Sequence, residues 1–182
     1  GASGSEGVYK INNPQEFEES FENGLQDWVL EEYLEGPSYS LEVLGFSGVY
    51  KVLQITELHM DEIYDCKRVV GSDILPDELR AEFESIALKL ARSLNLEGIM
   101  DVETILHQGK LKVLEIDARL PSQTPIAVYH ATGINMLEMI GKSFELGKPW
   151  QEFDVCVKRS VIFEHIRLIN DRLEICGEHI MA

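Results

Sequence analysis

The stretch from residue 99 to residue 120 constrains the fold of this 182-residue chain more than any other. Two runs, 99–107 and 110–118, alternate apolar with polar side chains, and the dipeptide Gln108-Gly109 between them is typical of a tight turn. The pattern therefore predicts an antiparallel hairpin. Because alternate residues of a strand share a face, one face of this hairpin should be apolar and the other charged.

The charged face carries several carboxylates. Glu115, Asp117 and Arg119 share a face of the second strand, and Asp101 and Glu103 share a face of the first. The opposite face of the second strand, expected to point into a core, carries Leu114, Ile116 and Ala118. A turn at Gln108-Gly109 would bring Glu103 and Glu115 close to opposite positions, where like charges destabilise a sheet by roughly 0.2–1 kcal/mol per pair. A magnesium ion would remove this repulsion, and a salt-bridged, solvent-exposed hairpin face is the alternative.

The remaining sequence divides into short apolar runs separated by turn residues. Strands are predicted at residues 8–11, 28–34, 39–46, 49–60, 63–70, 155–166 and 173–180, and helices at 14–23, 76–94, 126–130 and 136–144. The clearest helix, at 76–94, has an apolar stripe made of Leu79, Phe83, Ile86, Leu90 and Leu94. Because antiparallel strands dominate and helices are few, the predicted fold class is α+β.

Composition narrows the classes of function. The chain has 16 Lys and Arg against 32 Asp and Glu, so its net charge of −16 argues against binding to nucleic acid or to anionic membrane surfaces. No apolar run approaches the roughly 18 residues of a membrane-spanning helix. Cys66, Cys156 and Cys176 lack the spacing of a zinc motif and suit reduced thiols. We therefore expect a cytoplasmic protein with no nucleic-acid or membrane partner.

Two further segments allow more than one interpretation. Residues 1–7, Gly-Ala-Ser-Gly-Ser-Glu-Gly, can present backbone N–H groups to a phosphate or can form a plain linker. Residues 29–36, Val-Leu-Glu-Glu-Tyr-Leu-Glu-Gly, indicate by themselves only a strand that ends in a turn. A chain that opens inside a loop, with no methionine or strand before it, is expected to be a piece of a longer protein.

In this order, the loop, the strand and the charged hairpin resemble the ATP-grasp superfamily. The three segments read GASGSEGV, VLEEYLEG and DVETIL followed by LEIDAR, and twelve residues separate Glu103 from Glu115, as in the family pattern. The resemblance implies an ATP-grasp domain at 1–150, a mainly antiparallel sheet with flanking helices. It divides this domain into the remainder of a small subdomain at about 1–34 and a large subdomain at about 35–150. Residues 151–182 would begin a C-terminal β region.

The resemblance also implies two cofactors, ATP and Mg²⁺, and the residues that hold them. Glu103 and Glu115 correspond to magnesium ligands, and Asp117 stands where the family usually has asparagine. Arg119 corresponds to the catalytic arginine that stabilises phosphoryl and acyl-phosphate oxygens. The residues implied at ATP are Ser3, Gly4 and Ser5 over the phosphates, the backbone of Glu32, Tyr33 and Leu34 at adenine, and Glu31 at adenine or ribose.

A narrower likeness covers residues 114–133, which resemble the ligases of pyrrolysine biosynthesis. Those enzymes join the carboxylate of 3-methylornithine to the side-chain amine of lysine. Asp117 and the Ser-Gln-Thr-Pro run at 122–125 belong to this likeness. It implies that Ser122, Gln123 and Thr124 lie beside an amino-acid substrate.

The activity implied is that of an ATP-dependent carboxylate–amine ligase that acts through an acyl phosphate on small amino acids. Homodimers are common among such enzymes. The alternatives are another amide-forming or carboxylating ATP-grasp ligase, a catalytically silent nucleotide-binding module, or a plain α+β scaffold. Such ligases also have an N-terminal Rossmann-like domain and two phosphate-binding lysines that would precede residue 1. We therefore expect the 182-residue chain alone to show no turnover.

Overall fold

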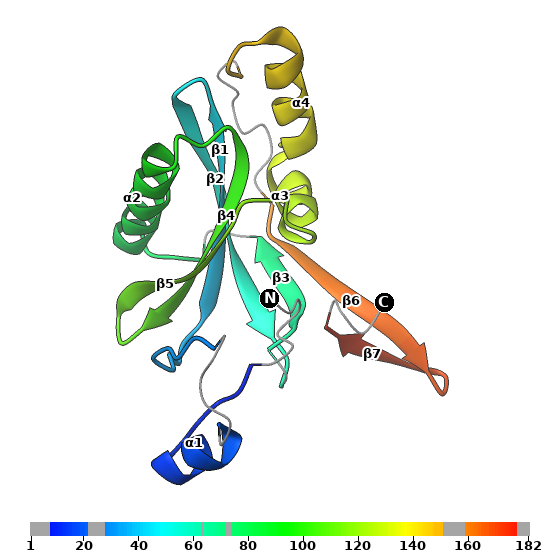
Figure 1. Ribbon diagram of the computed structural model, residues 1–182. Coiled ribbons are helices and arrows are strands. Elements are labelled where there is room, and N and C mark those ends of the chain that lie inside the picture. The colour runs from blue at the N-terminus through cyan, green and yellow to red at the C-terminus, as the bar shows by residue number, and fades with distance from the viewer. Residues whose placement is uncertain (1–7, 22–27, 63, 72–73, 151–158, 178–182) are drawn as a thin grey trace.

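The computed structural model describes residues 8–21, 28–62, 64–71, 74–150 and 159–177. Its strands are β1 (Ser38–Phe46), β2 (Val49–Met60), β3 (Cys66–Gly71), β4 (Gly98–His107), β5 (Lys110–Asp117), β6 (Val161–Ile169) and β7 (Arg172–Cys176). Its helices are α1 (Pro14–Ser20), α2 (Asp77–Ser93), α3 (Thr124–Thr132) and α4 (Met136–Leu146). The strands form one antiparallel sheet in the order β5-β4-β1-β2-β3-β6-β7 (Figure 1). The predicted α+β class is thus confirmed.

Three of the hairpins close through two-residue turns in which both residues have positive φ. This backbone is the type I′ turn, whose twist matches that of the flanking strands. The turn residues are Ser47 and Gly48 between β1 and β2, Gln108 and Gly109 between β4 and β5, and Asn170 and Asp171 between β6 and β7. The turn predicted at Gln108-Gly109 is therefore confirmed.

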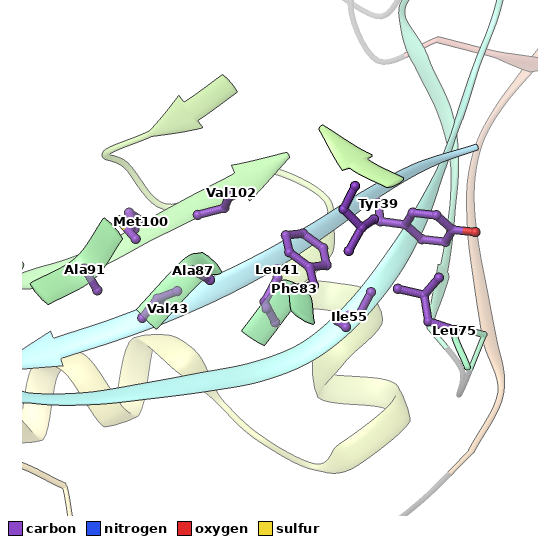
Figure 2. Close-up of a cluster of buried hydrophobic side chains, with 11 residues drawn as sticks. Tyr39, Leu41, Val43, Ile55, Leu75, Phe83, Ala87, Ala91, Met100 and Val102 are labelled. Atoms are coloured by element: carbon purple, nitrogen blue, oxygen red, sulfur yellow. The ribbon is translucent and has the colours of Figure 1, made fainter. Parts of the chain in front are cut away.

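Helix α2 covers one face of the sheet and forms the main hydrophobic core. Asp77 and Glu78 lie in its first turn, where their charges complement the helix dipole. Its buried stripe meets β1, β2 and β4 in a cluster of Tyr39, Leu41, Val43, Ile55, Leu75, Phe83, Ala87, Ala91, Met100, Val102 and Leu111 (Figure 2). Leu94, predicted as part of the stripe, is instead 58% exposed because it forms the C-cap of α2.

Helices α3 and α4 lie on the opposite side of the sheet from α2 (Figure 1). Ala127 of α3 packs against Leu58 and Val69 in a second, smaller buried cluster. Gly71 of β3 lies against the same helix, and a Cβ there would be in ordinary contact with the Ala127 carbonyl oxygen, at 3.5 Å. Helix α3 ends at Gly133, whose φ of +80° suits a glycine C-cap. The sheet is therefore covered on both faces.

The N-terminal segment departs from the prediction. Residues 8–11 and 28–34, both predicted as strands, have no regular secondary structure. Their apolar side chains are exposed, Val8 by 60% and Val29 by 80%, and within the described residues no neighbouring strand pairs with them. An extended run becomes a strand only when a neighbour supplies hydrogen-bond partners. The helix predicted at 14–23 is α1, which ends at Ser20.

At the other end of the chain, β6 and β7 form a hairpin that extends the sheet and projects from it (Figure 1). Strand β6 pairs with β3, and an Arg68–Glu164 ion pair (Nε–Oε1, 2.5 Å) joins the two strands. Residues 155–158 and 178–180 of the predicted strands lie outside the described residues. The domain boundary predicted at residue 150 stays a prediction. In the described part of the chain, no helix has the length and apolar character needed to cross a membrane.

Candidate metal- and nucleotide-binding site

The β4–β5 hairpin pairs its carboxylates as the alternation predicted. Glu103 lies opposite Glu115, and Asp101 lies opposite Asp117. Residues opposite each other in an antiparallel pair have their Cβ atoms about 4.5–5.5 Å apart. Two like-charged pairs therefore lie side by side at the end of β5.

A β-bulge controls which face these carboxylates occupy. Thr104 pairs with Val113, so Leu114 is an extra residue between that pair and the Glu103–Glu115 pair. Leu111, near the turn, points into the α2 core. Strict alternation from Leu111 would place Glu115 on the α2 face as well. The extra residue shifts the phase and moves Glu115 to the other face.

The predicted core face of β5 is wrong at its charged end. Leu114 is 42% exposed and Ile116 is 39% exposed, and Ala118 is also exposed. Strand β5 is the edge of the sheet, and α2 covers it only near Leu111, which is 8% exposed. The alternation separated the apolar from the polar positions, but it carries no information about whether a helix covers the end of an edge strand that is far from the turn.

Across three strands the polar residues form two rows. The first row is Asp117, Asp101 and Glu42, and the second row is Glu115, Glu103 and Ser40, on β5, β4 and β1 respectively. Both rows lie on the face opposite α2, because the alternating neighbours Leu41 and Val102 point into the α2 core. The Ser40 hydroxyl links the rows by donating a hydrogen bond of 2.6 Å to Asp101 Oδ1.

Burial and crowding raise the pKa values of these carboxyl groups. Burial, followed by the charges of Asp101 and Glu115, raises the pKa of Glu103 to about 8. Burial raises the pKa of Asp101 to about 6, although the bond from Ser40 lowers it in part. Desolvation and then the charge of Asp117 raise the pKa of Glu115. The rows therefore disfavour the ionised carboxylates in the absence of a cation, and a bound cation would stabilise them.

Arg119 is the basic side chain beside the rows. Its Nη2 atom lies 2.5 Å from Asp117 Oδ2, and 61% of its side-chain surface is exposed. Among the described residues, no lysine, arginine or histidine forms an ion pair with Glu103 or Glu115. The alternative of a fully salt-bridged hairpin face is therefore not what the structure shows.

The donor set fits magnesium. Carboxylate oxygens are hard ligands, and Mg²⁺ commonly uses one or two of them while keeping water and substrate phosphates as its other ligands. No group of three His, Cys, Asp or Glu side chains converges into a complete metal cage in the part of the chain that is described. The facing pair Glu103 and Glu115 supplies the two carboxylates that such a site requires, and Asp117 lies next to it in the neighbouring row.

The segment predicted to meet adenine runs beside the turn end of the same hairpin. Glu31, Glu32 and Tyr33 are exposed and Leu34 is half-buried. Glu32 forms an ion pair of 3.9 Å with Lys112 of β5. The segment is thus joined to the strand that carries Glu115 and Asp117.

Gly36 is the tightest contact between this segment and the hairpin. A Cβ at Gly36 would lie 2.1 Å from the Leu106 carbonyl oxygen, and the φ of +155° also favours glycine. On either side of it, the Glu35 N–H donates to His107 Nδ1 at 3.1 Å, and the Leu106 N–H donates to the Pro37 carbonyl at 2.9 Å. Close backbone approach therefore fixes the predicted adenine segment along β4.

The residues predicted beside the substrate begin α3. Ser122 is exposed, whereas Gln123 and Thr124 are 5% and 4% exposed. Gln123 Nε2 donates to the Cys66 carbonyl at 3.4 Å, which ties the start of α3 to β3. The predicted phosphate-covering residues Ser3, Gly4 and Ser5 lie outside the described residues.

Two members of the rows, Ser40 and Glu42, did not emerge from the sequence. A signal for them existed, because Tyr39, Leu41 and Val43 alternate with Ser40 and Glu42 in an otherwise apolar run. A charged residue on the inner face of a central strand requires a partner. The pattern did not reveal that β1 pairs with β4, and this pairing is what brings Glu42 beside Asp101.

Comparison with known proteins places this geometry in a family. A family model described as "ATP-grasp domain" matches residues 1–123. The chain is similar to the 3-methyl-D-ornithine–L-lysine ligases of Methanosarcina mazei (39% identical over 185 residues, 99% of this chain) and Methanosarcina acetivorans (41% over 156 residues, 85% of this chain). It spans 46% and 41% of the lengths of these two relatives, which is less than half of each.

A solved structure agrees with the sequence comparison at the level of the fold. The biotin carboxylase domain of Hydrogenobacter thermophilus 2-oxoglutarate carboxylase, described in complex with MgADP and bicarbonate, matches with a TM-score of 0.76 at 19% identity. The match covers 91% of this chain and 39% of that one. The family model, the relatives and the shared sheet agree, and the chain belongs to the ATP-grasp family.

Proposed function

We propose that this chain supplies the MgATP-binding part of an ATP-dependent ligase that joins a carboxylate to an amine through an acyl phosphate. The observation that carries the proposal is the pair Glu103 and Glu115, directly opposite each other and without basic partners among the described residues, with Arg119 at the end of the same strand. A cation site beside an exposed guanidinium suits phosphoryl transfer, where catalysis depends on positioning and charge stabilisation.

The proposed roles follow from these positions. Glu103 and Glu115, with Asp117 beside them, would hold Mg²⁺, which supplies charge neutralisation for the phosphate oxygens of ATP. Arg119 would release Asp117 and donate to the oxygens of the transferred phosphoryl group and of the acyl phosphate. The backbone at 32–34 would bind adenine, with Glu31 near adenine or ribose, and residues 3–5 would cover the phosphates.

The proposed reaction has two steps. The carboxylate oxygen of one amino acid attacks the γ-phosphorus of ATP, and the bond to the bridging oxygen breaks to give an acyl phosphate and ADP. The amine of a second amino acid then attacks the acyl carbon, and phosphate leaves. The identities of 39% and 41% to the two Methanosarcina ligases support 3-methyl-D-ornithine and L-lysine as the two amino acids. Ser122, Gln123 and Thr124 would lie beside one of them.

The test uses the full-length protein that contains this chain. MgATP, lysine and 3-methyl-D-ornithine are supplied together and then with each amino acid omitted, while ADP release and products are followed by mass spectrometry. We expect an amide of the two amino acids only when both are present. ADP release without that amide would reject the substrates and retain an ATP-grasp ligase of another specificity. Absence of nucleotide turnover with any amino acid would favour a silent nucleotide-binding module.

We also propose that the protein is a cytoplasmic homodimer. The H. thermophilus domain was solved as a dimer, and Cys176 is a free thiol in this structure, as suits a reducing compartment. Light scattering of the full-length protein coupled to size-exclusion chromatography measures the oligomeric state. A mass equal to one chain would contradict the dimer.

A further inference from the structure

Glu42 is an acidic side chain enclosed within the sheet. It lies on central strand β1 at a β-bulge, since the β1–β2 register shifts between Leu41 and Val43. Its side chain is 0% exposed, and neither carboxylate oxygen makes a well-formed hydrogen bond to a described residue, although the Thr124 hydroxyl lies close enough to lower the pKa of the carboxyl group. No basic side chain in that part of the chain forms an ion pair with it. Burying an acid without a partner is costly, so this arrangement points to a group that binds there.

The surroundings of Glu42 contain further unpartnered oxygens. The Thr124 hydroxyl at the start of α3 lies within reach of its carboxyl group. Thr56 pairs with Ser40, two residues before Glu42 on the same face of β1, and Gln54 lies within the bulge of β2, opposite Glu42. The Thr56 hydroxyl and the Gln54 Oε1 atom are buried and lack partners among the described residues, and the buried Thr124 hydroxyl makes no well-formed hydrogen bond there. An ionised carboxylate and an amide carbonyl oxygen only accept hydrogen bonds, so a donor group would complete this cluster when Glu42 is ionised.

A positively charged donor would suit the ionised form of Glu42. Burial, followed by the charge of Asp101, raises the pKa of Glu42 to about 8 in the chain without ligands. A cation would favour the ionised carboxylate and satisfy its oxygens together. A primary ammonium group has three N–H donors, which match one carboxylate and neighbouring neutral oxygens. Magnesium suits this spot less well, because it retains several waters and Glu42 is fully buried.

The position of Glu42 connects this cation to the reacting groups. It is the inner end of the first row, next to Asp101 and two strands from Asp117. Helix α3 begins over it, and the residues at that end of the helix are those predicted to lie beside an amino-acid substrate. A substrate amine bound here would place the rest of the amino acid toward Arg119 and the carboxylate pair.

We propose that Glu42, together with the Thr124 hydroxyl, is the receptor for a primary ammonium group of an amino-acid substrate. This inference rests on the proposed ligase function, because it names the group by which that site recognises its amino acid. Glu42 is covered by the first turn of α3, and residues 118–123 between β5 and α3 form no helix or strand. Entry of the ammonium group therefore requires this first turn to move outward from the β5 edge.

The primary test replaces Glu42 in the full-length protein. Glu42→Gln keeps the shape and removes the charge, and Glu57→Gln is the matched control. Glu57 lies on β2, where it pairs with Tyr39 of the α2 core, so it is on the opposite face of the sheet. At saturating MgATP, we expect Glu42→Gln to raise the KM for one amino acid by about tenfold or more. The KM of Glu42→Gln for MgATP should stay within about twofold of the wild-type value. The KM values of Glu57→Gln for the amino acid and for MgATP should do the same.

A binding measurement without turnover identifies the amine. The melting temperature is recorded with ornithine, with norvaline, which lacks the side-chain amine, and with 5-aminopentanoic acid, which lacks the α-amine. The wild type should be stabilised by ornithine and lose that stabilisation with one of the two analogues. Glu42→Gln should not distinguish ornithine from that analogue, while its melting temperature without ligand stays close to that of the wild type. Lysine and its corresponding analogues are tested in the same way.

The outcomes separate this inference from the proposed function. If Glu42→Gln has an unchanged KM for the amino acid and is still stabilised by ornithine as the wild type is, the inference is overturned. Glu42 would then contact an enclosed water or have a purely structural role. A raised Mg²⁺ requirement with normal amino-acid KM would also overturn it, by assigning Glu42 to the metal. If the wild type makes no amide, the proposed function fails, and loss of ornithine stabilisation in Glu42→Gln still supports the ammonium site. If Glu42→Gln does not fold, Glu42→Asp, which keeps the charge but shortens the reach, must raise the same KM.

Discussion

Glu103 and Glu115 are the two residues on which the proposed metal site depends most directly. We expect Glu103→Gln and Glu115→Gln each to lower turnover by about 100-fold or more, because each removes a charged ligand from a facing pair. In the absence of Mg²⁺, neither variant should melt below the wild type, since each relieves like-charge repulsion. ADP release across a Mg²⁺ titration, with parallel thermal melts, measures both effects. Near-normal turnover in both variants would refute the metal assignment.

Arg119 should behave differently from the carboxylates. Its guanidinium is exposed and held by Asp117 in the structure, and the proposal gives it a role at the transferred phosphoryl group. Arg119→Ala should therefore lower kcat by about 100-fold while changing the KM for MgATP by less than about fivefold. Steady-state kinetics with Arg119→Lys as the intermediate case measure this split. A larger effect on the KM than on kcat would make Arg119 a binding residue only.

At the scale of single elements, the approach of Gly36 to the hairpin is the clearest constraint. Gly36→Ala would place a Cβ 2.1 Å from the Leu106 carbonyl oxygen, so the segment at 32–37 must move away from β4. We expect a raised KM for MgATP with a smaller change in kcat, because the predicted adenine segment is displaced while the carboxylates stay in place. Nucleotide binding measured by calorimetry checks this. Gly48→Ala, at a turn where a Cβ would have open space, is the control for the strain of positive φ alone.

Several elements were predictable from sequence because their signals are local. Strand β2 has the predicted bounds, 49–60, and the turn at Gln108-Gly109 follows from its residue types. The facing of Glu103 and Glu115 followed from counting back from that turn. The exposure of Leu114 and Ile116 was not predictable, because it depends on β5 being the sheet edge. The runs at 8–11 and 28–34 have strand-like composition, but only tertiary contacts decide whether they pair.

At the scale of the whole molecule, stability depends on the core between α2 and the sheet. Phe83 is fully buried at its centre, between β1 and β4 side chains (Figure 2). Phe83→Ala should lower the free energy of unfolding by about 3–5 kcal/mol, because it removes a large side chain and leaves a cavity. Urea denaturation of the full-length protein measures this difference. Leu94→Ala, on the same helix but exposed, should cost far less, and equal losses would contradict the position of the core.

The sheet order explains which site residues escaped prediction. Ser40 and Glu42 are about sixty residues before Asp101 in sequence, and they become neighbours only because β1 lies between β2 and β4. Residues far apart in the chain give no short-range pattern that reveals such a crossover. The carboxylates within one hairpin were therefore predictable, whereas the row that crosses to β1 required the three-dimensional structure.

The bulge at Leu114 acts on β5 in the way that a single inserted base acts on a reading frame. Every side chain after Leu114 lies on the face opposite to the one that strict alternation from Leu111 would give. Glu115 and Asp117 therefore lie on the α3 side of the sheet because Leu114 is an unpaired extra residue. Deleting Leu114 should give a hairpin with a regular ladder, in which Glu115 follows Val113 directly and still lies opposite Glu103. Such a protein should fold, and its melting temperature should still respond to Mg²⁺, whereas loss of the response would mean that the bulge itself shapes the proposed site.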